Sequence, residues 1–483
     1  MNYRMIFNVL GKTLILEGIF LFISLCVGLI YKDGNYMAFL CPMIGVFAIG
    51  GGLCLIKTKN KSIYAKEGLI IVALVWILFS LVGAFPFVLC KELAGNLSYI
   101  DAVFETVSGF TTTGGTIFTD VEILSKGIQF WRLFTHWIGG MGVLVFVLAV
   151  IPKHSSGFMH LFRAEAPGHA PDKLVSKVRR TALILYGIYA SLTLLEVILL
   201  LIGGMPLYDS LLHSFSTAGT GGFGIYNQSI AHYNSAYIEI VISIFMFLFG
   251  INFNFFYLIL IGRISKAFKM EEVRHYVIII FIATLVITIN ILSVCDNFGQ
   301  ALRYAFFQVS SVGSTTGFYC ATNYGSWPVL SRSILLILTV IGACGGSTGG
   351  GLKVARLSIL CKSSMKGIRG NINPNSVRQI MHEGEVLDKK VEHGVRTYFI
   401  IWVGLVIVAT LLLSIDGVHD VYTNFTSSLS CIGNVGFNVV GENFCYATYS
   451  PFSKIILSML MLGGRLEIFP ILILFIPRTW RRG

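Results

Sequence analysis

The chain has 483 residues, of which 55% are apolar and only 12% charged, and its formal net charge is +12. A soluble domain carries about 25% charged residues, so this composition and a mean hydropathy of +0.77 exclude a water-soluble protein. Together they indicate an all-α integral membrane protein embedded in a lipid bilayer.

Apolar stretches of the roughly 20 residues that a membrane-spanning helix needs recur along the whole chain. We expect ten spans, at residues 13–31, 36–55, 68–90, 131–151, 181–203, 237–262, 276–294, 330–360 (interrupted), 395–415 and 453–476. The first is expected to be retained rather than cleaved as a signal peptide. Its apolar core is long, and no small-residue cleavage site precedes Tyr31-Lys32-Asp33.

Basic residues gather in the segments that would lie on one side of a ten-span protein, including residues 57–66 and 353–396. The opposite segments carry acidic residues such as Asp101, Asp120 and Asp420. Because cytoplasmic loops hold the excess of Lys and Arg, we expect the basic segments and both termini inside the cell. The net charge is then a topology signal, and nucleic-acid binding is not needed to explain it.

Four short polar stretches share one spacing, a Ser followed six residues later by a Gly. They are Ser108–Gly114, Ser216–Gly222, Ser311–Gly317 and Ser430–Gly436. Two residues before the Gly stands Thr112, Thr220, Thr315 or Asn434. Short residues let backbone carbonyls approach a desolvated ion, so the repeat predicts a four-part filter for a cation. Four unrelated surface loops would explain the Gly and Thr content but not the common register.

A short amphipathic segment precedes each polar stretch, at residues 98–108, 207–217, 298–311 and 419–430. These segments are too short to cross the bilayer, and each begins near an aspartate. We expect half-membrane pore helices whose loops converge on one axis, because non-helical backbone at membrane depth must be buried in protein or line a watery cavity. Their C-terminal dipole ends would favour a cation.

This recurrence predicts a division of the chain into two N-terminal helices and four pore repeats. The N-terminal helices occupy residues 1–66, and the repeats occupy residues 67–180, 181–275, 276–394 and 395–483. Each repeat is a long helix, a pore helix, a filter loop and a second long helix around one shared pore.

The filter stretches resemble those of the TrkH/TrkG/KtrB superfamily of bacterial potassium uptake proteins. The stretches are Phe104-ETVSGFTTTGGT, His213-SFSTAGTGGF, Phe307-QVSSVGSTTGF and Ser428-LSCIGNVGF. The resemblance covers nearly the whole chain, and the length and two extra N-terminal spans are more similar to TrkH or TrkG than to KtrB. One departure is that Gly115 follows the first filter glycine, where the other three loops have Phe.

The resemblance implies potassium uptake across the bacterial inner membrane, with one glycine of each loop serving potassium selectivity. The residues then expected to bind potassium are Thr112, Thr113, Gly114, Thr220, Gly221, Gly222, Thr315, Thr316, Gly317, Asn434, Val435 and Gly436. It also implies a homodimer and a TrkA-like cytoplasmic nucleotide-binding subunit, for which residues 153–180 and 362–392 offer docking surfaces. The sequence has no phosphate-cradling or zinc-protease motif, so we expect no enzymatic activity and no cofactor besides the transported potassium.

A second glycine-rich stretch, at residues 342–353, interrupts the eighth span. Its match to G-x-S-x-G is not a nucleophile elbow, because no strand precedes it. The resemblance implies an intramembrane gating loop made of Gly345, Gly346, Ser347, Thr348, Gly349 and Gly350. A passive, closely packed kink is the alternative.

Arg465 and Glu467 lie in the last span, and an ionisable residue at membrane depth indicates function. We expect Arg465 to reach the gating loop and obstruct cations when the loop is closed. Its alternative role is a local ion pair that joins two helices.

Two other functions stay open at this point. A sodium- or proton-coupled potassium symporter would need a coupling-ion site, and the sparse intramembrane carboxylates argue weakly against one. A non-transport membrane sensor would leave the four aligned loops unexplained.

Overall fold

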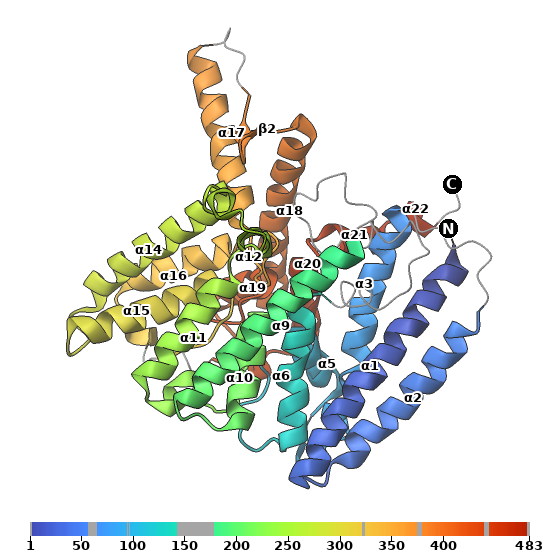
Figure 1. The fold of residues 1–483 in the computed structure, drawn as a ribbon. Helices are drawn as coiled ribbons and strands as arrows, with labels where there is room; N and C mark the ends of the chain where they lie inside the picture. Colours follow the sequence, from blue (N-terminus) through green and yellow to red (C-terminus); the bar gives the residue numbers. More distant parts are fainter. Residues whose placement is uncertain are drawn as a thin grey trace.

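The computed structural model describes residues 2–480 except 57–64, 94, 96, 143–177, 321–323, 374–378 and 439–443. The regular structure of the described residues is helical except for one hairpin of two-residue strands, β1 (Met381–His382) and β2 (Glu385–Val386). The all-α prediction did not include this hairpin. Both termini lie close together at the end of the bundle from which one polar helix projects (Figure 1).

Two long helices, α1 (Tyr3–Tyr31) and α2 (Tyr36–Cys54), form an antiparallel hairpin along one edge of the bundle (Figure 1). Their backbones approach closely at Gly11 and Gly50, where a Cβ on Gly11 would lie 2.8 Å from the Gly50 carbonyl oxygen. Small residues at a helix crossing permit this packing in membranes. Helix α1 begins ten residues before the predicted start, because the Asn2 side chain caps it by accepting from the Met5 amide.

A long helix, a short helix, a loop and a second helix then recur four times. The first set is α3 (Ala65–Val82) with α4 (Phe85–Val88), α5 (Tyr99–Phe110) and α6 (Lys126–Gly140). The second is α9 (Val178–Ile202), α10 (Leu207–Gly219), and α11 (Ala236–Phe249) with α12 (Phe253–Leu260). The third is α14 (Glu271–Ile291), α15 (Phe298–Gly313), and α16 (Val329–Ile341) with α17 (Val354–Ile372). The fourth is α18 (Lys389–Leu413), α19 (Val421–Gly433), and α20 (Pro451–Arg465) with α21 (Phe469–Phe475).

Short elements connect these helices. They are α13 (Ile264–Phe268), α22 (Pro477–Trp480) and the 3₁₀ turns Lys91–Leu93, Ser229–Tyr233, Tyr324–Ser326, Ser414–Asp416 and Tyr446–Thr448.

Within the described residues, six helices are long and apolar enough to cross a membrane, and seven if α11 and α12 form one span bent by 90°. The other predicted spans contain shorter helices. Helix α6 ends at Gly140, before residues that lie outside the described part. Helices α16 and α20 are each followed by a non-helical segment that separates them from α17 and α21. The all-helical membrane class is confirmed, and the bend between α11 and α12 and the break after α20 add to the interruption that was expected in the eighth span.

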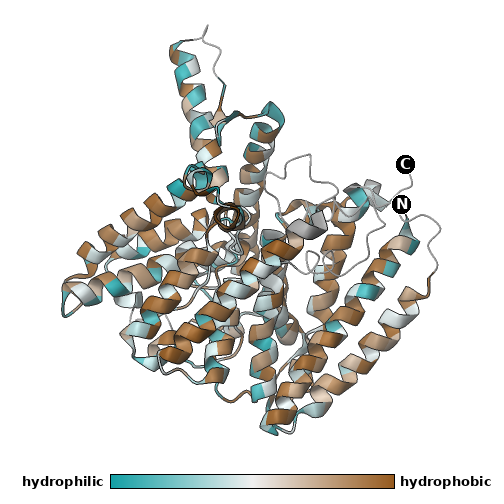
Figure 2. Ribbon diagram, viewed as in Figure 1, coloured by the Kyte–Doolittle hydropathy of each residue, from teal (hydrophilic) through white to brown (hydrophobic). Residues whose placement is uncertain are grey.

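Apolar residues cover the bundle helices, whereas α17 carries many polar residues (Figure 2). Large apolar side chains point outward from the bundle, such as Phe281 at 62% exposure and Ile289 at 68%. In water such exposure would be costly, so these faces are suited to lipid. The buried interior is formed instead around the short helices α5, α10, α15 and α19.

Candidate functional site

The four filter loops have one backbone conformation. Each short helix ends at or just before a residue in the left-handed region, with φ of 54° at Thr112, 56° at Thr220, 63° at Thr315 and 52° at Asn434. The glycine two residues later has φ of 79° at Gly114, 77° at Gly222, 89° at Gly317 and 68° at Gly436. A threonine in this region is uncommon and persists only where its surroundings impose it.

One backbone hydrogen bond accounts for the common Ser–Gly spacing. In each loop the amide five residues after the serine donates to the serine carbonyl. The bonds are Thr113 to Ser108 (2.9 Å), Gly221 to Ser216 (2.9 Å), Thr316 to Ser311 (2.7 Å) and Val435 to Ser430 (3.0 Å). This bond is the six-to-one closure that ends a helix through a left-handed residue. It turns each chain sharply away from its pore helix and into the filter.

The four loops meet in a closed ring that follows chain order. A Cβ built on each filter glycine would collide with a carbonyl oxygen of the next loop, far inside the 3.0 Å limit that real Cβ atoms respect. The colliding pairs are Gly114 with Gly221, Gly222 with Thr316, Gly317 with Val435, and Gly436 with Thr113. Only glycine fits at these positions, and the carbonyl before each glycine lies beside the neighbouring loop.

The structure therefore brings together all twelve residues expected to bind potassium. They are buried, or nearly so, at the centre of the four short helices. The Asn434 side chain also joins two loops, since its Nδ2 donates to Thr113 Oγ1 at 2.9 Å.

The glycine-rich stretch between α16 and α17 lies directly against the filter. The Gly350 amide donates to Thr315 Oγ1 at 2.7 Å. A Cβ on Gly349 would lie 2.7 Å from the Ser314 carbonyl oxygen, so this loop approaches the filter backbone at more than one point. Positive φ angles at Gly342, Gly346 and Gly351, from 70° to 78°, explain why glycines recur here.

The stretch is fixed from several sides. Lys353 Nζ donates back to the Gly349 carbonyl at 2.6 Å. The Cys344 amide donates to Gly250 at 3.0 Å, and Phe253 donates to Gly346 at 3.0 Å. These last two bonds occupy backbone groups that the 90° bend between α11 and α12 would otherwise leave open.

Arg465, the last residue of α20, connects the stretch to the end of α6. Its Nη1 donates to the Thr348 carbonyl at 2.6 Å, while Nη2 donates to Gly140 at 2.6 Å and also to Gly139 at the end of α6. The guanidinium thus bridges three carbonyl oxygens. Glu467 is paired with a different cation, Arg356 of α17.

A buried ion pair behind the first two filter loops was missed by the sequence interpretation. Glu105 of α5 and Arg132 of α6 are 2.6 Å apart and at most 2% exposed. Glu105 accepts from the Ile117 amide at 2.9 Å, and Arg132 donates to the Gly224 carbonyl at 2.9 Å. The pair therefore holds the exits of both loops. Charges inside a predicted pore helix and a predicted span were the signal that could have indicated it.

An aromatic stack supports the second loop from behind. The Arg132 guanidinium lies 3.6 Å from the centre of the Phe223 ring. The His136 ring also stacks on Phe223, with 4.2 Å between the two ring centres. His136 Nδ1 is 3.0 Å from Ser216 Oγ. Phe223 directly follows the filter glycine, so the phenylalanine at the position that Gly115 occupies in the first loop has a packing role here.

At the outer mouth, side chains join the loops that follow the filters. Asn227 donates from Nδ2 to Asp120 at 2.8 Å and accepts from the Val121 amide at 2.9 Å. Hydrogen bonds from Asn227 and from the Glu122 amide hold the pKa of Asp120 below its ordinary value. This carboxylate is charged at neutral pH, and it is one of the acidic residues expected on the outer side of the membrane, where they would concentrate cations.

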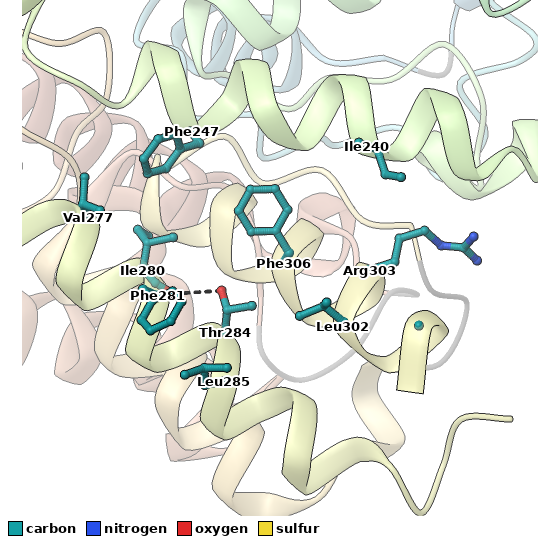
Figure 3. Close-up of a pocket in the computed structure, with 11 residues that line it drawn as sticks. Ile240, Phe247, Val277, Ile280, Phe281, Thr284, Leu285, Leu302, Arg303 and Phe306 are labelled. Carbon is teal, nitrogen blue, oxygen red and sulfur yellow. Dashed lines mark hydrogen bonds between the residues drawn. The ribbon is translucent and has the colours of Figure 1, made fainter. Parts of the chain in front are cut away.

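An apolar cavity lies elsewhere, between α11, α14 and α15. Its volume is about 460 Å³, and side chains such as Phe247, Phe281 and Phe306 surround it (Figure 3). Such a lining offers no set of converging oxygens to a cation, so it is not the ion path. Among the residues that the structure describes, no group of three or more His, Cys, Asp or Glu could hold a metal ion.

The profile of the TrkH family, described as cation transport protein, matches residues 36–482. The Trk system potassium uptake proteins TrkH of Salmonella typhimurium (strain LT2) and Escherichia coli (strain K12) are each 35% identical to this chain over 490 residues, covering 100% of both sequences. TrkG of Escherichia coli (strain K12) is 31% identical over 485 residues, with 99% of each covered. The crystal structure of the potassium transporter TrkH from Vibrio parahaemolyticus superimposes with a TM-score of 0.89 at 29% identity and 100% coverage of both chains.

Proposed function

As a member of the TrkH family of cation transport proteins, this chain is a potassium uptake transporter of the bacterial inner membrane, and we propose that potassium passes through the ring of four filter loops. The activity is transport and not enzymatic. The observation that carries the proposal is the ring, in which each filter glycine lies against the carbonyl of the next loop.

The chemistry of this ring suits a desolvated potassium ion. Carbonyl oxygens of Thr113, Gly221, Thr316 and Val435 come from four loops with the same φ pattern, so they can replace water around one ion on a common axis. The pore helices end at the filter, and their C-terminal dipole ends add negative potential there. We assign ion binding to these residues and their neighbours at positions 112–114, 220–222, 315–317 and 434–436.

Residues Gly345–Gly350 act as the gate in this proposal. The Gly350 amide bonds to a filter residue, and Arg465 bonds to Thr348, so the loop and a cation both lie on the path out of the filter. A positive charge in a low-dielectric passage repels a passing potassium ion strongly. Uptake then requires the loop and the guanidinium to move aside together.

Potassium entry needs no chemical step. An inside-negative potential supplies about 2.3 kcal/mol per charge for each 100 mV. A pore with such a driving force must be closed for part of the time, and the chain carries no nucleotide-binding motif. We therefore propose control by a cytoplasmic nucleotide-binding subunit that docks on residues 362–392, where α17 projects from the bundle (Figure 1). Most of the other proposed docking segment, residues 153–180, lies outside the described residues.

The proposal extends to the assembly of the protein and to its division into repeats. We propose that the chain forms a homodimer and that its functional units are residues 1–66 followed by pore repeats at 67–180, 181–275, 276–394 and 395–483. Each repeat contains one short helix and one filter loop of the ring.

Flux in proteoliposomes tests the transport proposal. Purified protein in vesicles with a potassium gradient and an imposed potential is expected to carry potassium at a rate that follows the potential. A requirement for a proton or sodium gradient would instead favour coupled symport. The absence of potassium-selective flux in every ionic condition would contradict the proposal.

A further inference from the structure

The carboxyl group of Glu272 binds the start of the gating loop and the start of α17. Glu272 is the second residue of α14 and is 5% exposed. Its Oε1 accepts from the Gly345 amide at 2.6 Å and from the Ala355 amide at 3.1 Å. The first amide belongs to the start of the loop, and the second belongs to the first turn of α17. One carboxyl oxygen therefore joins the loop, α14 and α17.

A second glutamate attaches the cytoplasmic hairpin to the same helix end. Glu383 and Gly384, with φ of 52° and 81°, form the two-residue turn between β1 and β2. The Glu383 carboxylate accepts from the amides of Glu271 and Glu272, both at 3.1 Å. These amides at a helix start have no partner within the helix, and negative charge is favoured there.

The attachment is reciprocal and includes α17. The Glu271 carboxylate accepts from the Glu383 amide at 3.3 Å and from Lys362 Nζ. Lys362 also donates to the Met381 carbonyl at 2.8 Å. The hairpin, the start of α14 and α17 are thus bound to one another by charge-assisted hydrogen bonds at the cytoplasmic end of the protein.

We propose that Glu383 and Glu272 form a latch that transmits movement of the cytoplasmic hairpin to the gating loop. Glu272 joins both halves of the latch, because its amide binds Glu383 and its carboxylate binds Gly345. Met381 and Val386 of the hairpin are 48% and 54% exposed, so a cytoplasmic partner can reach this element. Displacing the hairpin uncaps α14 and releases the clamp on the loop. The latch rests on the proposed gating function, and both glutamates are positioning residues that do not touch the ion.

Cys344 provides a direct reporter of loop position. It adjoins Gly345 and is fully buried. In full-length protein whose other nine cysteines are replaced by serine, the rate of Cys344 modification by a membrane-permeant thiol reagent measures loop release, and Cys344→Ser gives the background. Potassium flux is measured on the same proteoliposomes.

The variants separate the latch from general destabilisation. Glu272→Ala and Glu383→Ala are expected to raise both Cys344 labelling and potassium flux about tenfold, because each removes two hydrogen bonds from backbone amides. Glu272→Gln and Glu383→Gln keep an acceptor oxygen and are expected to restore most of the parent behaviour. Glu385→Ala is the matched control, since it removes an exposed carboxylate from the same hairpin and is expected to change neither readout.

The outcomes distinguish the latch from the gating function. Raised labelling with unchanged flux would keep the latch but overturn the gating role of residues 345–350. Unchanged labelling in both alanine variants, or an equal increase in Glu385→Ala, would overturn the latch. If Glu272→Ala does not insert, the cytoplasmic Glu383→Ala decides by the same criteria.

Discussion

Replacing Gly222 by serine is expected to abolish most discrimination between potassium and sodium while leaving the protein inserted. The new Cβ would collide with the Thr316 carbonyl oxygen, which we assign to ion binding, and the residue would keep a φ of 77°. A non-glycine residue in this region costs about 1–2 kcal/mol, and relief of the collision requires the carbonyl to move. If that movement removes only about 1.4 kcal/mol of the preference for potassium, selectivity falls tenfold.

The permeability ratio of potassium to sodium, from reversal potentials in proteoliposomes, measures this effect. Gly224→Ser is the matched control, because a Cβ there would meet nothing closer than 3.4 Å, the distance to the Tyr226 carbonyl oxygen. It lies in the same loop, and its carbonyl can still accept from Arg132. An unchanged ratio in folded Gly222→Ser, or an equal loss in the control, would refute the steric reasoning.

Arg465→Ala, or deletion of residues Gly345–Gly350, is expected to raise potassium flux because each removes part of the obstruction below the filter; unchanged or abolished flux in folded variants would contradict the gating assignment. Glu105→Ala is expected to cost about 3–5 kcal/mol of stability because it leaves a buried arginine unpaired, and thermal unfolding in detergent would show the reasoning wrong if the midpoint did not fall. The pKa of Asp120 is lowered, so its contact with Asn227 is favoured above the ordinary carboxyl pKa and lost as pH falls through the lowered pKa. Uptake by the parent and by Asp120→Asn should therefore keep a constant ratio from pH 7 down to about 4, where an ordinary aspartate is already partly protonated, and a ratio that changes above pH 4 would contradict the lowered pKa. Gentle extraction from native membranes is expected to recover a cytoplasmic nucleotide-binding subunit with the chain, whereas recovery of the chain alone with nucleotide-independent flux would remove the docking proposal.

The four filter loops could be predicted from the sequence because their conformation depends on residues close together in the chain. The Ser–Gly spacing reflects one backbone hydrogen bond within each loop, such as that from Thr113 to Ser108, and this bond is repeated in register. Glycine-rich interruption of a span also indicates unwinding from the sequence alone. Short-range rules therefore predicted that the four Ser–Gly stretches and the stretch between α16 and α17 are non-helical loops.

Contacts between distant residues could not be predicted in this way. Glu105 meets Arg132 across 27 positions, and Glu272 meets Gly345 across 73, with no spacing that links them. The break after α20 was also missed, because Glu467 and Ile468 adopt φ of 57° and 65° without a glycine or proline at either position. These features depend on packing and charge pairing in the assembled bundle.

Anomalous diffraction from crystals grown with rubidium in place of potassium would show where the ion binds. We expect anomalous density on the axis of the ring, coordinated by the carbonyl oxygens of Thr113, Gly221, Thr316 and Val435. Weakening of that density by potassium but not by sodium would show selective occupation of the same site. Density only outside the ring, or equal displacement by sodium and potassium, would contradict a potassium filter built from the four loops.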